Sequence, residues 1–237
     1  MNENEFFEDY YKKGKDAWEI FTNKIRAEKF YERVKKTKSY LNSLDNKKLR
    51  ILDVGCGEGF FSKELGYDNI IGIDVSFQAA IRAKNSIEKV FVGNAVKLPF
   101  KDESFDVVLC METLYYHDKN LMMHELHRVI KKNGHLILSL GNKDNIKKIL
   151  YKLISKKTEE DVIYSKNKKS WSEKRYSSKE LKKLIETSGF EILKYSGILF
   201  DLPVLSRYAV IRKFLLFPLS NLFKDNSNQI IIFARKK

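Results

Sequence analysis

The sequence predicts a single α/β domain built on a mostly parallel β-sheet, and three observations support this prediction. Short apolar runs alternate along the first 140 residues with stretches of helical periodicity, which is the pattern of successive βαβ units. The chain has 237 residues, 43% of them hydrophobic, which suits one domain with a substantial core better than two. Closely spaced glycines follow the first apolar run, as expected where a buried strand turns tightly into a helix.

Five apolar runs are the candidates for the parallel strands, because each is short and bounded by polar or turn-forming residues. In chain order they are 50–54, 69–74, 90–93, 105–110 and 135–140. The intervening helices are expected at 60–65, 78–87 and 121–130. Asn133-Gly134 is expected to end the last of these helices.

The segments on either side of this core have a different character. Residues 3–44 read as helical, because aromatic and aliphatic residues recur among charges at a spacing close to 3.6. After the fifth strand, a helix is expected at 178–188 and is stopped by Gly189, and strands are expected at 190–195 and 229–234. We therefore expect one domain, 1–237, with an N-terminal helical lid at 1–44, a basic amphipathic insertion at 141–175 and an apolar cap insertion at 200–226.

The positive charge is concentrated in the last third of the chain. Residues 1–140 hold 23 Lys+Arg and 21 Asp+Glu, whereas residues 141–237 hold 22 and 10, so the net charges are +2 and +12. A basic surface attracts phosphates, on nucleic acid or on anionic lipid. The alternative is that these lysines are simply solvated on helix faces.

The cysteine content and the N-terminus indicate a cytoplasmic protein. Cys56 and Cys110 do not make a disulfide framework, there is no CxxC pair, and we expect no metal. The first ten residues are acidic and lack the features of a signal peptide. No segment approaches the ~20 apolar residues that span a bilayer.

The glycine loop after the first strand is the strongest functional signal. Glycines at 55, 57 and 59 let the backbone turn tightly and approach a ligand. A dinucleotide fingerprint fails in both registers, because Phe60 and Ser62 stand where its third glycine belongs, and no P-loop lysine follows. Asp53, at the strand end, would repel a pyrophosphate and suits a ligand with a positive amino group. Asp74, at the end of the second strand, can accept from both hydroxyls of a ribose or can cap a helix.

Four segments, 52–59, 72–76, 91–108 and 125–136, resemble the motifs of class I (Rossmann-like) S-adenosylmethionine-dependent methyltransferases in order and spacing. Residues 175–181 and 188–190 resemble the late helix and sixth strand of that family. The resemblance implies a Rossmann-like, seven-stranded, mostly parallel sheet with helices on both faces, an antiparallel last strand and a helical cap insertion. It also implies S-adenosylmethionine as cofactor and S-adenosylhomocysteine as product.

The same resemblance assigns the parts of the cofactor to residues. Asp53, Gly55 and Gly57 would hold the methionine part, and Asp74 the ribose. Asn94 and Ala95 would meet the adenine, although the family more commonly has Asp where Asn94 stands. The remaining residues expected around the cofactor are Cys56, Val75, Cys110, Met111 and Tyr11.

The segment 110–118 is the expected acceptor side, because the family places acceptor-facing residues after the fourth strand. Many relatives have histidine where Tyr115 and Tyr116 stand, and His117, one position later, could take the role of base. The alternative is a loop histidine, and the two tyrosines line the acceptor pocket or pack in the core. Tyr10, Tyr11 and Trp18 form a lid over the cofactor or pack against the sheet.

The apolar and basic late segments favour a small-molecule or lipid-linked acceptor, with peripheral contact to an anionic membrane. A cap packed over the active site would also explain the apolar residues. The rival is an RNA methyltransferase acting on tRNA, which fits the +12 charge of residues 141–237 but lacks a recognisable RNA-binding module. A third reading is a cofactor-binding regulator or a catalytically silent partner subunit.

Overall fold

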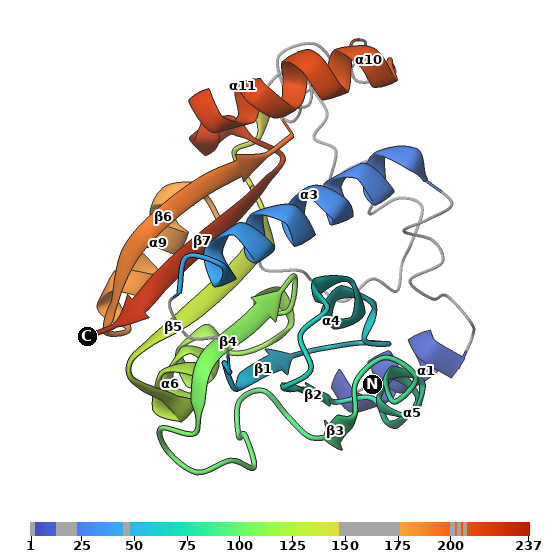
Figure 1. Cartoon of the computed structure of the whole chain (residues 1–237), viewed down its shortest axis with the longest axis vertical. Coiled ribbons are helices and arrows are strands. Elements are labelled where there is room, and N and C mark those ends of the chain that lie inside the picture. Colours follow the sequence, from blue (N-terminus) through green and yellow to red (C-terminus); the bar gives the residue numbers. More distant parts are fainter. Residues whose placement is uncertain are drawn as a thin grey trace.

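A seven-stranded sheet forms the centre of the computed structural model, which describes residues 3–12, 23–44, 48–146, 176–199, 202, 205 and 208–237 (Figure 1). The strand order is β3-β2-β1-β4-β5-β7-β6. Only β7 is antiparallel to its neighbours β5 and β6, so the predicted mixed sheet with an antiparallel last strand is confirmed. The strands are β1 Ile51–Val54, β2 Ile70–Asp74, β3 Lys89–Val92, β4 Phe105–Met111, β5 Ile130–Gly141, β6 Phe190–Ile198 and β7 Gln229–Lys236.

Helices cover both faces of this sheet, as predicted. The described helices are α1 Glu3–Lys12, α3 Lys24–Leu41, α4 Phe60–Leu65, α5 Phe77–Ala83, α6 Lys119–Val129, α9 Ser178–Thr187, α10 Ala209–Ile211 and α11 Phe217–Leu222. A π-helical turn, Arg212–Leu216, joins α10 to α11, and short 3₁₀ turns lie at Leu114–Tyr116 and Lys224–Asn226.

Two hydrophobic cores result, because alternate residues of each strand point to opposite faces. On one face Leu52, Val108 and Leu138 pack with residues of α6 and α9. On the other face, neighbouring strand residues such as Ile51 and Leu109 pack with residues of α3 and α4. The near-continuous apolar strands of the sequence are therefore explained by burial on both sides.

Some predicted boundaries differ from the observed ones. The helical stretch expected at 3–44 contains two described helices, α1 and α3, and residues 13–22, with Trp18, lie outside the described residues. Most of the insertion predicted at 141–175 also lies outside them. Asn133-Gly134 does not end α6, which stops at Val129; it lies within β5, at a shift in the register with β4. Asn133 has a φ of 61°, so the turn signal marks a bulge in the strand.

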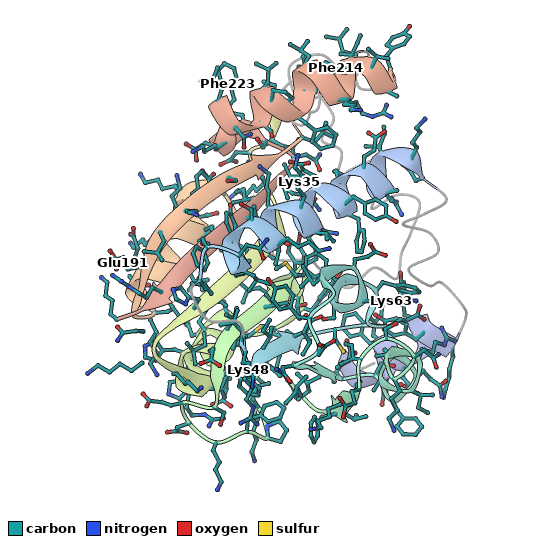
Figure 2. All side chains as sticks on the ribbon, in the orientation of Figure 1. Lys35, Lys48, Lys63, Glu191, Phe214 and Phe223 are labelled. Carbon is teal, nitrogen blue, oxygen red and sulfur yellow. The ribbon has the colours of Figure 1, made fainter. Side chains whose placement is uncertain are left out.

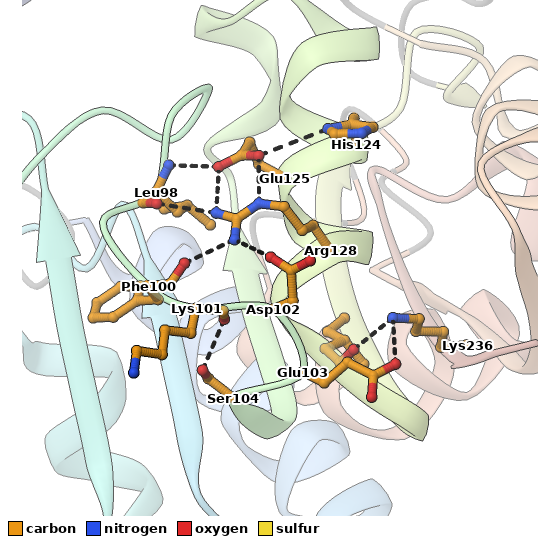
Figure 3. Close-up of polar contacts among 11 residues, drawn as sticks. Leu98, Phe100, Lys101, Asp102, Glu103, Ser104, His124, Glu125, Arg128 and Lys236 are labelled. Atoms are coloured by element: carbon orange, nitrogen blue, oxygen red, sulfur yellow. Dashed lines mark hydrogen bonds and ion pairs between the residues drawn. The ribbon is translucent and has the colours of Figure 1, made fainter.

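An arginine on α6 fastens the loop that leads from β3 to β4 (Figure 3). Arg128 donates to both carboxylate oxygens of Glu125 at 2.8 Å, to Asp102 at 2.8 Å, and to the carbonyl oxygens of Phe100 at 2.7 Å and Leu98 at 3.0 Å. Planar, fork-like donor geometry makes arginine suited to such multiple contacts. The network holds residues 98–102 against α6. These residues follow Asn94 and Ala95, which are predicted to meet the adenine.

The described residues contain neither a membrane-spanning helix nor a cluster of metal-binding side chains. None of the helices placed in the structure is long and apolar enough to cross a bilayer. Among the same residues, no group of three or more His, Cys, Asp or Glu side chains could hold a metal ion.

Candidate functional site

A cavity of about 480 Å³ lies at the edge of the sheet where β1, β2 and β4 end. Its walls come from the loops after these strands and from α1, which closes one side. Ligands of open α/β sheets bind at this carboxyl edge of the strands. The lining residues are Phe6, Phe7, Tyr10, Tyr11, Val54, Gly55, Ile73, Asp74, Val75, Gly93, Ala95, Met111, Glu112, Thr113, Tyr116 and His117.

The glycine loop folds tightly between β1 and α4. The backbone N–H groups of Gly55 and Cys56 donate to the carbonyl oxygen of Ile73 at 2.8 and 3.1 Å. Gly55 has a φ of 71°, and a Cβ there would lie 2.4 Å from the side chain of Thr113. Gly57 has a φ of 53°. Only glycine adopts these angles readily and permits this approach, so the loop depends on its glycines.

Asp74 is held at the cavity wall by backbone donors. One carboxylate oxygen accepts from the N–H of Gly57 at 2.8 Å, and the other accepts from the N–H of Ser76 at 3.0 Å. Burial raises the pKa of Asp74, and these two hydrogen bonds oppose that shift. The cap of α5 is Ser76, whose hydroxyl accepts from the N–H of Ala79 at 3.2 Å, so capping does not explain Asp74. Each oxygen of Asp74 keeps a lone pair that a ligand hydroxyl can use.

Asp53 lies beneath the glycine loop and does not line the cavity. The hydroxyl of Ser62 donates to its carboxylate at 2.6 Å. Burial raises the pKa of Asp53 to about 6, the Ser62 hydrogen bond lowers it, and the neighbouring charge of Asp74 raises it further. Two acidic groups therefore lie close together under the loop, an arrangement that favours a cationic ligand nearby.

Glu112, a partly buried residue in the cavity wall, is held by several polar contacts. Glu112 has a φ of 59°, in the left-handed region that side chains rarely adopt, and its carboxylate forms an ion pair with Arg33 of α3 at 3.0 Å. The same carboxylate accepts from Ser139 at 3.1 Å and from the hydroxyl of Tyr115. The Tyr115 hydroxyl also accepts from the N–H of Gly141. These contacts fix the segment after β4, at some cost in backbone strain.

The two tyrosines predicted for the acceptor side have different positions. Tyr115 is buried beneath the cavity, where burial and the Glu112 charge raise the pKa of its hydroxyl. Tyr116 lines the cavity, and its ring packs edge-on against Phe7 of α1 at a centroid distance of 5.0 Å. His117 also lines the cavity, is 8% exposed and lies close enough to Asp74 for its charge to lower the pKa of that carboxyl.

Helix α1 lies across the mouth of the cavity. The hydroxyl of Ser76 donates to Glu8 at 2.7 Å, and the guanidinium of Arg82 donates to the carbonyl oxygen of Tyr11 at 3.1 Å, so α1 is fastened to α5. A Cβ at Gly57 would lie 2.9 Å from the Tyr11 hydroxyl, which places this hydroxyl over the glycine loop. Burial, followed by the Asp74 charge, raises the pKa of Tyr11. Tyr10 and Tyr11 thus line the cavity, and their role as a lid over the cofactor stays a prediction.

The structure brings about half of the expected cofactor residues to the cavity wall. Those that line it are Gly55, Asp74, Val75, Ala95, Met111 and Tyr11. Those that do not are Asp53, Cys56, Gly57, Asn94 and Cys110. Asn94 accepts from the N–H of Val96 at 3.0 Å. Cys56 and Cys110 are buried thiols whose pKa is raised by burial.

Sequence reasoning missed the Arg33–Glu112 pair and the cavity-lining Thr113. A charged residue within a helix and another just after a strand carry no pairing signal, so only the fold brings Arg33 to Glu112. For Thr113 a weak signal existed, since a small side chain must face the glycine that approaches it.

Comparison with known proteins gives a consistent result. Residues 52–138 match the family described as "Methyltransferase domain". An uncharacterized protein of Methanocaldococcus jannaschii is 36% identical over 107 residues, 45% of this chain and 47% of that protein, so this match spans about half of the relative's length. The ubiquinone biosynthesis O-methyltransferase of Rickettsia typhi is 29% identical over 191 residues, 76% of this chain and 73% of that enzyme.

Among solved structures, a SAM-dependent methyltransferase of Thermotoga maritima superimposes with a TM-score of 0.69 at 24% identity and covers 98% of both chains. At this identity the likeness concerns the fold. The matched segment 52–138 contains the cavity residues that follow the strands, whereas those of α1 lie outside it.

Proposed function

We propose that this chain, which belongs to the class I S-adenosylmethionine-dependent methyltransferases, transfers a methyl group to a small-molecule or lipid-linked acceptor. The observation that carries the proposal is the composition of the cavity. Its cofactor end is polar, with Asp74 and the glycine loop, and its other end is walled by the rings of Phe6, Phe7 and Tyr116. An aromatic wall of this kind suits an acceptor with apolar surface.

The cavity fits the cofactor. Its volume of about 480 Å³ is in the range of small-molecule sites. Asp74 offers two oriented carboxylate oxygens for the ribose hydroxyls, and the backbone of Gly55 is open to close approach. The buried carboxylates Asp53 and Asp74 suit the positive charges of the methionine part. The bound cofactor supplies an activated methyl group on a sulfonium.

The protein's own contribution is alignment, exclusion of water and proton removal. The acceptor must face the methyl carbon in line with the bond that breaks, and the closed aromatic end of the cavity restricts its orientation. Helix α1, fastened through Glu8 to Ser76, keeps water out. His117, in the cavity wall, is placed to take the proton that an oxygen or nitrogen acceptor releases. Tyr115 positions Glu112 and does not face the acceptor.

A similar relative supports an acceptor with apolar character. The Rickettsia enzyme is an O-methyltransferase of ubiquinone biosynthesis, and the match covers about three quarters of each chain. The proposal includes a cytoplasmic location, which the buried free thiols Cys56 and Cys110 support, and contact with the membrane surface when the acceptor is lipid-linked.

The test is methyl transfer from labelled S-adenosylmethionine to a cell extract of the source organism, followed by separation of lipid, RNA, protein and small molecules. Label in the lipid or small-molecule fraction is expected. Label confined to RNA would contradict the proposal and favour an RNA methyltransferase that acts on tRNA. The +12 charge of residues 141–237 is the feature that supports this alternative. Cofactor binding without label in any fraction would indicate a regulator.

The role of His117 is tested by His117→Gln, with His124→Gln as the matched control. The side chain of His124 is 76% exposed on α6, so its replacement should leave turnover unchanged. For an oxygen acceptor, His117→Gln should lower kcat about 10²-fold or more. An unaltered kcat would show that His117 is not the base.

A further inference from the structure

The helical segment from α10 to α11 carries apolar side chains on its inner face as well as on its outer face. Its face toward the protein is centred on Arg212, Leu216 and Ser220, which are 2%, 0% and 1% exposed. Arg212 donates to Glu28 of α3 at 2.7 Å, and the hydroxyl of Ser220 donates to the carbonyl oxygen of Gly197 at 3.1 Å. Polar anchors therefore attach this segment to the body of the protein.

The opposite face of the same segment is apolar and exposed. Val210, Phe214 and Leu222 are 69%, 71% and 74% exposed, and Tyr208, Leu215 and Phe223 are 59%, 45% and 45% exposed. Figure 2 shows Phe214 and Phe223 on the outer side of the helix, away from the sheet. Soluble surfaces rarely group so many large apolar side chains, and such groups mark interaction sites.

Lysines border this face. Residues 202–224 contain no acidic residue. Of their described cations, Arg212 is buried and paired with Glu28, so Lys213 and the partly buried Lys224 remain at the surface, followed by the exposed Asp225. Lys213 is exposed, and its ammonium lies 5.5 Å from the ring centre of Phe214. An apolar helix face bordered by cations and aromatic rings is the composition of helices that lie in the interface of an anionic bilayer.

The position of the segment links it to the cavity. Since β6 and β5 are both antiparallel to β7, they run in the same direction. The α10–α11 segment follows β6, so it leaves the sheet at the carboxyl edge of the parallel strands, the edge that bears the cavity. In Figure 1 it lies beyond α3, at the outer end of the sheet.

We infer that the exposed α10–α11 face docks onto an anionic phospholipid surface, with Phe214 and Leu222 inserted among the headgroups. The inference rests on the proposed function, in which the protein meets a lipid-linked acceptor at the membrane.

The experiment is flotation of the full chain with vesicles of phosphatidylcholine alone or mixed with phosphatidylglycerol, without cofactor or acceptor. Binding is expected only to the anionic vesicles and should weaken with salt. The double variant Phe214→Ser, Leu222→Ser should bind at least about tenfold more weakly, since it removes two large apolar side chains from the interface. Lys213→Gln should weaken binding about fivefold, the contribution of one cation near the surface.

The matched control is the double variant Phe77→Ser, Ile81→Ser. It removes two apolar side chains of α5 that are 56% and 45% exposed. It should bind vesicles as the wild type does. Calorimetry with S-adenosylhomocysteine on every variant verifies the fold and tests the cofactor site separately. Failure of the wild type to float, or equal loss in the control, would overturn the inference while leaving the methyltransferase proposal intact. Self-association that is abolished by the α10–α11 variant, with no vesicle binding, would assign the face to a second copy of the chain instead.

Discussion

The substitution Asp53→Asn should stabilise the protein without ligand and weaken its binding of the cofactor. Asp53 is 2% exposed, and its pKa is raised by burial from 3.8 to about 6. Ionisation is therefore penalised in the folded state. Asparagine keeps an oxygen that can accept from Ser62 and carries no charge.

The magnitude follows from proton linkage. Because the folded pKa is raised, the contribution of Asp53 to stability is fully present below pH 3.8 and is lost as the pH rises through 6. A shift of about two pKa units corresponds to about 3 kcal/mol. The free energy of unfolding of Asp53→Asn, relative to wild type, should thus rise by about 3 kcal/mol between pH 4 and pH 7. Titrating groups that do not interact with Asp53 are shared by the two proteins and cancel in the difference.

Urea unfolding at several pH values measures this difference, and calorimetry at pH 7.5 measures the affinity for S-adenosylhomocysteine. The variant should bind the cofactor product about tenfold more weakly, because under the proposed function the buried carboxylate beneath the glycine loop attracts the cationic amino group, and the variant lacks this charge. A difference in unfolding free energy that stays constant from pH 4 to pH 7 would refute the claim that burial raises the pKa of Asp53. Undiminished affinity would refute its role opposite the amino group.

Three further predictions concern separate parts of the molecule. Asp74→Ala should weaken cofactor binding by about 1–3 kcal/mol through unpaired ribose hydroxyls, and wild-type affinity by calorimetry would contradict the ribose assignment. Gly57→Ala should also weaken binding, at least about tenfold, because the new Cβ would lie 2.9 Å from the Tyr11 hydroxyl at a φ of 53°; equal affinity would show that the loop and the lid adapt freely. Arg128→Ala should lower the free energy of unfolding by about 2–4 kcal/mol, since it leaves Glu125 and two carbonyl groups without their donor. Thermal unfolding measures this loss, and a melting temperature equal to that of the wild type would contradict it.

The sheet could be predicted from the sequence because each parallel strand is buried on both faces and so reads as an apolar run. The glycine loop and Asp74 were also accessible, since local backbone geometry demands glycine and the strand end fixes the carboxylate. The bulge at Asn133 was misread, because the same dipeptide signals a helix end or an irregular strand.

Other features depend on the tertiary fold. Nothing in the sequence around Glu112 indicates that Arg33 will neutralise it, since the pair forms only when α3 packs across the sheet. The exposed apolar face of α10–α11 was equally hidden, because a stripe of apolar residues normally predicts the buried face, and this segment has apolar side chains on both sides. Here Arg212 and Ser220 occupy the inner side through specific hydrogen bonds.

The position of α1 has a consequence for the timing of turnover. Phe6, Phe7, Tyr10 and Tyr11 form one wall of the cavity, and Glu8 and Arg82 fasten the helix to α5. Under the proposed function the cofactor binds behind this helix, so we expect its exchange to break these contacts. We expect product departure to be the slow step, and a rapid-quench experiment should then show a first turnover faster than all later ones.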